Sequence, residues 1–163
     1  MMNLAEKYKE EGRRHGMCDQ VFNELNPDTT KDELVEKWVA NIDFAIQSGW
    51  PTVEQIKEDF GDVIHKYNVY ADENVNLFDV PNVVLNGQCD ASVEYKKHMG
   101  RVYARHNTNL VVNATGTSRV FVSLYDNANV KVKTTVFARV YVYQNGTGKI
   151  ESEGNVLIRK KER

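Results

Sequence analysis

The sequence predicts an α+β protein in which a small N-terminal helical cap precedes a small two-sided β-solenoid. Three observations predict this fold. Helical spacing of apolar residues is confined to the first half of the chain. Between residues 82 and 158, apolar residues instead flank single intervening residues, and this pattern returns about every ten positions. Alternate copies of the pattern resemble one another more than neighbouring copies do, which gives a structural repeat of about twenty residues.

The first half begins with two weaker helix signals. Residues 3–15 form a charged segment of weak amphipathicity, and residues 18–25 form a short helical segment. The short segment ends before Pro27, since the residue that precedes a proline avoids the helical region.

Capping residues mark the two clearest helices. Thr30 can cap the free backbone amides while Glu33 reaches back, which is the capping-box spacing. Thr52 and Gln55 repeat this spacing at the start of the next helix. The first of the two helices should run without interruption to Gly49, because its apolar residues recur at three- and four-residue steps. They are Leu34, Val35, Trp38, Val39, Ile42, Ala45 and Ile46.

Nine short strands are expected after the helices, since alternation rich in β-branched residues, interrupted by Asn, Asp and Gly, is typical of strands. Strand character around Val75 and Leu77 is weaker. In each strand, two inward residues flank one outward residue. The inward pairs are Val83 and Leu85, Val93 and Tyr95, Val102 and Ala104, Leu110 and Val112, Val120 and Val122, Val130 and Val132, Val140 and Val142, Ile150 and Ser152, and Val156 and Ile158.

The outward residues alternate in character from strand to strand. In every other strand they are apolar: Val84, Tyr103, Phe121, Tyr141 and Leu157. In the strands between they are mostly polar: Glu94, Val111, Lys131 and Glu151. Two-strand coils explain this alternation. An antiparallel β-sandwich or barrel is the alternative, because such strands also form hairpins, but it gives no reason for alternate strands to share a pattern.

The distribution of charge divides the chain at nearly the same place as the change from helical to strand patterns. Residues 1–79 contain 17 acidic and 8 basic side chains, a balance of −9, and residues 80–163 contain 6 acidic and 13 basic side chains, a balance of +7. We therefore expect an acidic helical region at 1–79, the β-solenoid at 80–158 and a basic tail at 159–163. A basic half can bind nucleic acid. It can equally bind an acidic helical layer, which is the interpretation we favour.

Composition favours a cytoplasmic protein without a membrane partner, because no stretch resembles a membrane span or a secretory signal. Cys18 and Cys89 are too few for a disulfide framework or a zinc site. The four histidines also lack a second ligand at metal-binding spacing, so no metal and no cofactor are expected. They are His15, His65, His98 and His106.

Catalytic patterns are scarce. The sequence contains no glycine-rich phosphate loop and no Gly-x-Ser-x-Gly turn. Cys89 beside Asp90, with His98 or His106 nearby in sequence, would supply a nucleophile and a base. Their spacing gives this pairing no support, so we expect a protein that is not an enzyme.

One group of residues forms a candidate interface. Three arginines each precede an inward valine by one residue, so they should lie on the same outer face as the aromatic residues two positions later. Stacked coils would place them in ladders about 4.8 Å apart. Arginine with aromatic residues is typical of protein interfaces and of single-strand nucleic-acid binding. The six residues, which we call the Arg–aromatic face, are Arg101, Tyr103, Arg119, Phe121, Arg139 and Tyr141.

Three occupants suit the Arg–aromatic face. The chain's own acidic helices would neutralise the arginines, or a second subunit would cover the face in a homo-oligomer, and we expect one of these two arrangements. Nucleic acid is the third. The helical region offers Glu36, Asp43, Glu54, Glu58 and Asp59 for the first arrangement.

The segment at residues 125–130, with the sequence Tyr-Asp-Asn-Ala-Asn-Val, resembles the short coils of uncharacterised β-solenoid repeat proteins of gut Bacteroidetes and their mobile elements or phages. The resemblance covers about residues 82–158 and implies a fold without an activity. It would suit a host-protein inhibitor or a virion accessory. We therefore expect a non-enzymatic binding or assembly module that associates with itself or with another protein. An anion- or single-stranded nucleic-acid-binding protein is the alternative.

Overall fold

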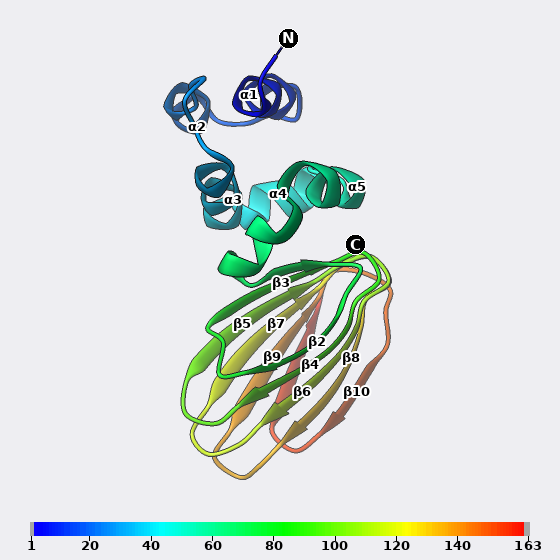
Figure 1. Cartoon of the computed structure of the whole chain (residues 1–163). Coiled ribbons are helices and arrows are strands. Elements are labelled where there is room, and N and C mark those ends of the chain that lie inside the picture. The colour runs from blue at the N-terminus through cyan, green and yellow to red at the C-terminus, as the bar shows by residue number, and fades with distance from the viewer. Residues whose placement is uncertain (1, 162–163) are drawn as a thin grey trace. The chain divides into compact units, whose positions relative to one another are not determined.

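The structure, a computed structural model that describes residues 2–161, has the α+β fold that the sequence predicts. The chain divides into two compact units, which we call the helical unit (Met1–Tyr67) and the solenoid (Asn68–Arg163). Figure 1 shows coiled ribbons in the first and stacked strands in the second. Every strand pair of the described residues is parallel, which excludes the antiparallel sandwich or barrel.

The helical unit consists of short helices joined by tight connections. Its elements are α1 (Leu4–Arg14), α2 (Asp19–Glu24), α3 (Lys31–Ala40), α4 (Ile42–Ser48), α5 (Val53–Gln55), the π-helical η1 (Ile56–Phe60) and the 3-10 helical η2 (Gly61–Tyr67).

Side chains cap several of these helices. At the start of α5 the capping box is complete: the Thr52 hydroxyl accepts from the Gln55 backbone N–H at 3.2 Å, and the Gln55 side chain accepts from the Thr52 N–H at 3.0 Å. At α3, Thr30 accepts from the Glu33 N–H at 3.2 Å. Each such cap satisfies a helix N–H that would otherwise lack a partner, which stabilises the helix by about 1 kcal/mol.

The continuous helix expected from Thr30 to Gly49 is wrong, because the structure breaks it at Asn41. The Asn41 backbone has φ −117° and ψ 36°, outside the helical region. Its side-chain amide donates to the carbonyl oxygen of Lys37 at 2.8 Å. Asparagine can satisfy the backbone locally in this way, so it competes with helix propagation. The apolar spacing continues across the break, which is why periodicity alone could not reveal it.

Aromatic rings and a carboxylate hold the helical unit together. The Tyr8 ring lies 5.3 Å from the Trp50 ring and 5.1 Å from the Phe60 ring, measured between centroids. The Tyr8 hydroxyl donates to Asp59 at 2.7 Å, and the Lys7 ammonium pairs with the same carboxylate at 3.0 Å. The N-terminal helix α1 is thereby tied to η1.

The solenoid contains the nine predicted strands and two more upstream of them. Its strands are β1 (Val69–Ala71), β2 (Asn74–Phe78), β3 (Asn82–Asn86), β4 (Asp90–Tyr95), β5 (Met99–Ala104), β6 (Asn109–Ala114), β7 (Arg119–Leu124), β8 (Asn129–Thr134), β9 (Arg139–Gln144), β10 (Ile150–Glu153) and β11 (Val156–Lys160). β2 coincides with the weak strand signal around Val75 and Leu77. Arg159 and Lys160, assigned to the basic tail from the sequence, belong to β11, and residues 162 and 163 of that tail lie outside the described residues.

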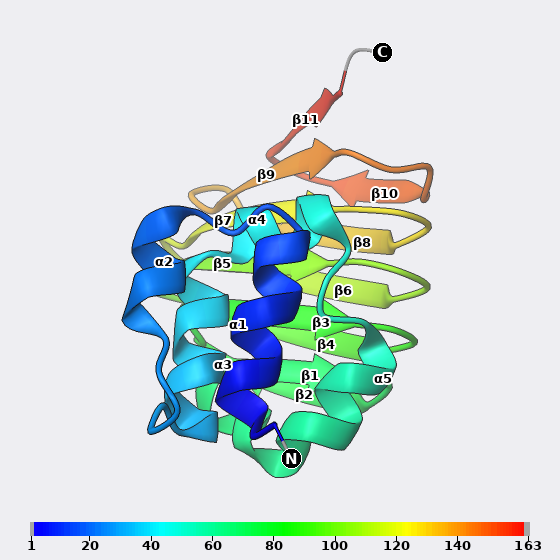
Figure 2. The same cartoon turned by 90° about the horizontal axis from the view of Figure 1, so that it is seen from above.

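The strands form two parallel sheets, and the chain alternates between them. The six-stranded sheet has the order β1-β3-β5-β7-β9-β11, and the five-stranded sheet has the order β10-β8-β6-β4-β2. Each coil therefore contributes one strand to each sheet. Figure 2 shows the successive coils stacked along one direction. This is the two-sided solenoid that the alternation of outward residues predicts.

Inward side chains form aliphatic ladders between the sheets. Val120 and Val140 are partners in register on β7 and β9, and neither is exposed to solvent. Val130 on the opposite sheet is 1 % exposed. Predictions that these three valines point inward and that residues 120 and 140 lie on neighbouring strands are confirmed.

One part of the predicted register is wrong. From the repeated Arg-Val-aromatic sequence, Val102 and Val120 should be ladder partners, but the structure pairs Val120 with Gly100 and Val102 with Val122. The coil keeps a length of twenty residues here, whereas the two sequence copies are only 18 residues apart. Gly100 provides the space for this register, because a Cβ atom at that position would overlap the buried ring of Tyr95.

Polar side chains link the coils at their corners. The Asn109 amide donates to Asp90 at 3.1 Å, and the Asn129 amide donates to Asn109 at 3.0 Å. Asp126, in the turn between β7 and β8, has a φ of 54°, a backbone conformation that Asn and Asp tolerate better than most residues. Side-chain amides thus extend the backbone ladder around the turn.

Candidate functional site

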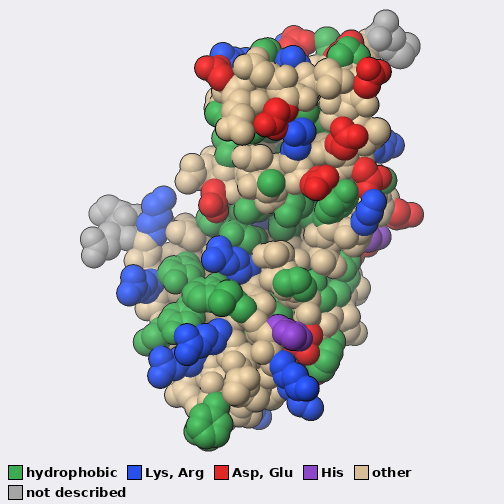
Figure 3. All heavy atoms as spheres, turned by 90° about the vertical axis from the view of Figure 1, so that its left-hand side faces the viewer, with side chains coloured by type: hydrophobic (Ala, Val, Ile, Leu, Met, Phe, Trp, Pro, Cys, Tyr) green, Lys and Arg blue, Asp and Glu red, His purple; other side chains and the backbone are tan. Residues whose placement is uncertain are grey.

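The Arg–aromatic face lies on the outer side of the six-stranded sheet, as predicted. Its members come from β5, β7 and β9. All three arginines are exposed and all three aromatic rings are half-buried. Figure 3 shows Lys and Arg side chains beside hydrophobic ones on one side of the solenoid, in the lower part of the picture.

The register arranges these residues differently from the two parallel ladders expected. Arg119 and Arg139 are partners, but Met99, not Arg101, continues their column. A second column contains Arg101, Phe121, Tyr141 and Leu157 in that order. A third contains Tyr103, Ser123, Tyr143 and Arg159. The prediction that the three arginines form one ladder is therefore wrong at Arg101. The cause is the one that shifts Val102: the coil is twenty residues long, whereas Arg101 and Arg119 are only 18 residues apart.

The second column is a stack of flat groups. The Phe121 and Tyr141 rings are stacked, with centroids 5.0 Å apart and an angle of 11° between their planes. On the other side of Phe121, the Arg101 guanidinium carbon lies 5.7 Å from the ring centroid, within cation–π distance. Both faces of the Phe121 ring are therefore in contact with neighbouring side chains, and its edge is the part left to meet a partner.

This sheet surface carries cations without anions. From β5 to β11, none of its outward residues is Asp or Glu. Within the described part of the solenoid, no ion pair involves Arg101, Arg119 or Arg139. Sequence analysis missed Tyr143 and Arg159, which lie on the same surface one strand position beyond the triplets considered. Continued alternation past the second inward valine was the signal that could have identified them.

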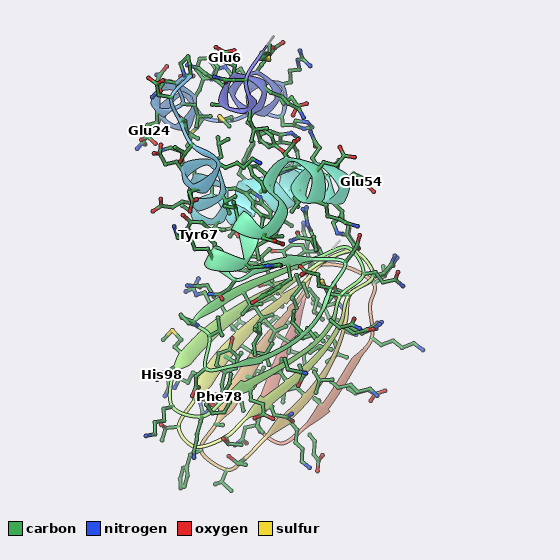
Figure 4. The ribbon with its side chains drawn as sticks, in the orientation of Figure 1. Glu6, Glu24, Glu54, Tyr67, Phe78 and His98 are labelled. Atoms are coloured by element: carbon green, nitrogen blue, oxygen red, sulfur yellow. The ribbon has the colours of Figure 1, made fainter. Side chains whose placement is uncertain are left out.

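Acidic side chains dominate the helical unit, and several already have partners there. Figure 4 shows Glu6, Glu24 and Glu54 around the outside of this unit. Asp59, which we expected to neutralise arginines, instead binds Lys7 and Tyr8. Burial, together with the hydrogen bond to Asp59, raises the pKa of Tyr8 well above its ordinary value. Asp32 binds Lys66 at 2.7 Å, and this interaction lowers the pKa of its carboxyl group.

The cysteine considered as a nucleophile is in an unfavourable place for that role. Cys89 is fully buried, and its thiol donates to the Asn86 carbonyl oxygen at 3.2 Å. Burial raises the pKa of this thiol, whereas a reactive cysteine needs a lowered one. His106 accepts through Nδ1 from the Gly87 backbone N–H at 2.8 Å, which is a structural role. His98 is exposed on the outside of the solenoid (Figure 4).

The helical unit contains a partly open apolar pocket of about 150 Å³. Aromatic and aliphatic side chains line most of it, among them Tyr8, Leu34, Trp38, Phe44 and Trp50. Among the described residues, the indole N–H of Trp38 is the one buried side-chain polar atom without a hydrogen-bond partner. That atom has almost no accessible surface, so it is enclosed by the surrounding packing and does not face a solvent-filled space.

Comparisons of the chain with models of known protein families, with curated proteins and with solved structures gave no match. Within residues 2–161, none of the helices is long and apolar enough to cross a membrane. In the same part of the chain, no three His, Cys, Asp or Glu side chains are close enough together to hold a metal ion.

Proposed function

We propose that the protein is a non-enzymatic binding module whose Arg–aromatic face binds an acidic protein surface. The resemblance to phage and mobile-element solenoids makes a host protein or a virion component a suitable partner. Support comes from residue chemistry. Arginine and tyrosine are, with tryptophan, the residues enriched at the energetic centres of protein interfaces. Both are concentrated on β5, β7 and β9 without a carboxylate beside them.

The stack of Arg101, Phe121 and Tyr141 is the observation that carries this proposal. Sequence-tolerant binding of single-stranded nucleic acid relies on bases that stack on the free faces of aromatic rings. Here Phe121 has a guanidinium on one face and a ring on the other. Tyr141 has Phe121 on one side and Leu157 as its register neighbour on the other. Ring edges beside arginines suit a protein surface that combines carboxylates with apolar side chains.

A binding comparison tests the proposal. We would measure the fluorescence anisotropy of two labelled probes of equal negative charge, an acidic peptide with interspersed leucines and a single-stranded oligonucleotide. The peptide should bind more tightly, and the change Arg119→Gln with Arg139→Gln should weaken its binding at least tenfold. The oligonucleotide should bind weakly at moderate salt.

Lys131→Gln with Lys133→Gln is the matched control, because it removes the same charge from exposed residues on the opposite sheet. It should leave peptide binding almost unchanged. Tight oligonucleotide binding that falls steeply with salt, as counterion release requires, and that is lost in the arginine variant would reject the protein partner in favour of nucleic acid.

A further inference from the structure

In the described part of the solenoid, β10 and β11 form the outermost coil on one side. These are the terminal strands of their sheets, so each pairs with a neighbour of the described residues on one side only. Side-chain burial falls at the same place. Val142 on β9 is 1 % exposed, whereas its ladder partner Ile158 on β11 is 41 % exposed. One further layer would bury this end of the core.

The free edge of β11 carries backbone groups able to extend the sheet. The Asn155 carbonyl oxygen accepts from the Val140 N–H at 3.2 Å, and the Lys161 N–H donates to the Gln144 carbonyl oxygen at 2.9 Å. Backbone groups point to alternate sides along a strand. Ile158 and Lys160 therefore direct their N–H and C=O groups away from β9, toward the open edge.

The free edge of β10 follows the same rule. The Lys149 carbonyl oxygen accepts from the Val130 N–H at 3.0 Å, so Lys149 faces β8. By alternation, Ile150 and Ser152 direct their backbone groups toward the open edge. An exposed edge of this kind is a template for pairing with another chain.

The outward charges of the two edge strands have opposite signs. β10 carries Glu151 and Glu153, which are in register with Lys131 and Lys133 on β8. β11 carries Arg159 at its outward position. Cations and anions thus already alternate from β8 to β10, and the alternation would continue if a cationic strand were added next to β10.

Symmetry then distinguishes between two end-to-end arrangements. A two-fold axis perpendicular to the sheets would pair β11 with β11 and β10 with β10, and it would place Arg159 and the two glutamates beside like charges. A two-fold axis parallel to the strands would pair each β11 with the partner's β10 in antiparallel orientation. That arrangement places Arg159 beside carboxylates at two equivalent positions. Opposite charges on neighbouring strands stabilise their pairing, and like charges oppose it.

We propose that two copies of the chain form an end-to-end dimer in which β11 of each pairs antiparallel with β10 of the other. The six-stranded sheet of one copy would continue into the five-stranded sheet of its partner. Each joined sheet would then contain eleven strands, six plus five, and the exposed Ile158 would become an interior residue. This closed two-fold contact leaves no free sheet edge at the junction and therefore cannot extend into a fibre. It uses the strand edges of β10 and β11 rather than the six residues of the Arg–aromatic face, and it does not depend on that proposal.

Sedimentation equilibrium over a range of protein concentrations tests the dimer. The full chain should show a monomer–dimer equilibrium that weakens as salt is added. Arg159→Glu should weaken the dimer at least tenfold, and so should Glu151→Arg combined with Glu153→Arg. All three changes together should restore it, because the charges are then exchanged. Ser152→Pro should also weaken it, since proline removes the edge N–H.

Arg119→Glu makes the same charge change on β7, two strands away from the terminal β11, and should leave the dimer unaffected. Circular dichroism should show that each variant is folded. The proposal would be overturned by a monomer at every concentration, by assemblies that grow beyond two copies, or by a dimer whose strength is the same in Arg159→Glu. Failure of the combined charge exchange to restore association in a folded protein would reject the pairing of β11 with β10.

Discussion

The helical unit and the solenoid are stabilised in different ways. Each link in the helical unit occurs once, such as the hydrogen bond from Tyr8 to Asp59 at 2.7 Å or that from Trp50 to Glu11 at 3.3 Å. In the solenoid, the same backbone pairing and the same valine contact recur in every central coil, as between β5, β7 and β9. A substitution in the solenoid therefore tests a repeated rule, and one in the helical unit tests an individual contact.

The largest loss of stability is expected from a charge at an inward position of the solenoid. Val130→Asp would place a carboxylate at a position that is 1 % exposed between the two sheets. Burial of an unpaired charge should lower the free energy of unfolding by about 4 kcal/mol or more. Urea unfolding followed by circular dichroism would measure this loss.

Val111→Asp is the matched control, because the same chemical change falls on an outward residue that is 38 % exposed. Its register neighbour is Lys131, which favours an acidic side chain. The cost should be no more than about 1 kcal/mol, from the lower strand propensity of Asp. Equal losses for the two variants would contradict the assignment of inward and outward positions.

A smaller effect concerns the one coil whose register departs from the sequence similarity. Gly100→Ala would force a methyl group into the Tyr95 ring and should cost about 1 to 3 kcal/mol by overpacking. Combining it with Tyr95→Leu, which makes room, should cost less than the sum of the two single changes. A double-mutant cycle on urea unfolding would measure this coupling, and strict additivity would show that the two side chains do not meet.

Most of the solenoid could be predicted from the sequence, because each coil repeats the same alternation of inward and outward residues. Alternation identified the inward residues and the outward position of Phe121 and Tyr141. Register was harder, since similarity between residues 101–104 and 119–122 competes with the constant coil length. Gly100 permits the observed register, because a Cβ atom there would overlap the Tyr95 ring, and a fit between two strands of this kind is not recorded in the repeat pattern. In the helical unit, caps such as Thr52 could be predicted, but the break at Asn41 and the pairing of Asp59 with Tyr8 depend on individual tertiary contacts.

The loss of stability at high pH can be compared between the two units, because each contains one buried tyrosine. Burial raises the pKa of Tyr8 and of Tyr95 above the ordinary 10.0. A raised folded-state pKa means that stability is constant below pH 10 and falls above it, where the unfolded chain loses a proton that the folded chain retains. Each tyrosine should contribute about 1.4 kcal/mol of loss per pH unit there. Tyr8→Phe should make the loss above pH 10 less steep.

Tryptophan fluorescence during urea unfolding at several alkaline pH values would follow this change, because both tryptophans belong to the helical unit. Tyr95→Phe serves as the counterpart in the solenoid, monitored by circular dichroism. An unchanged slope in both variants would show that neither hydroxyl resists ionisation in the folded protein.

The smallest change in stability is expected from the indole N–H groups of the two tryptophans in the helical unit. Trp38→Phe removes an indole N–H that has no partner, so the loss of ring volume is partly offset and the free energy of unfolding should change by less than about 1 kcal/mol. Trp50→Phe removes an N–H that donates to Glu11 at 3.3 Å and should cost more. Chemical unfolding followed by circular dichroism would rank the two, and the opposite order would contradict the hydrogen-bond assignment.

The constant twenty-residue spacing in the middle of the solenoid makes the length of the protein adjustable. Val102, Val122 and Val142 are successive partners in register, twenty residues apart at each step. Duplication of one coil in the gene would therefore reproduce contacts that already exist and create no new kind. Each added coil would lengthen the molecule by about 4.8 Å, the spacing between neighbouring strands. Insertion of coils, by evolution or by design, would therefore lengthen the outer surface of each sheet in steps of one strand.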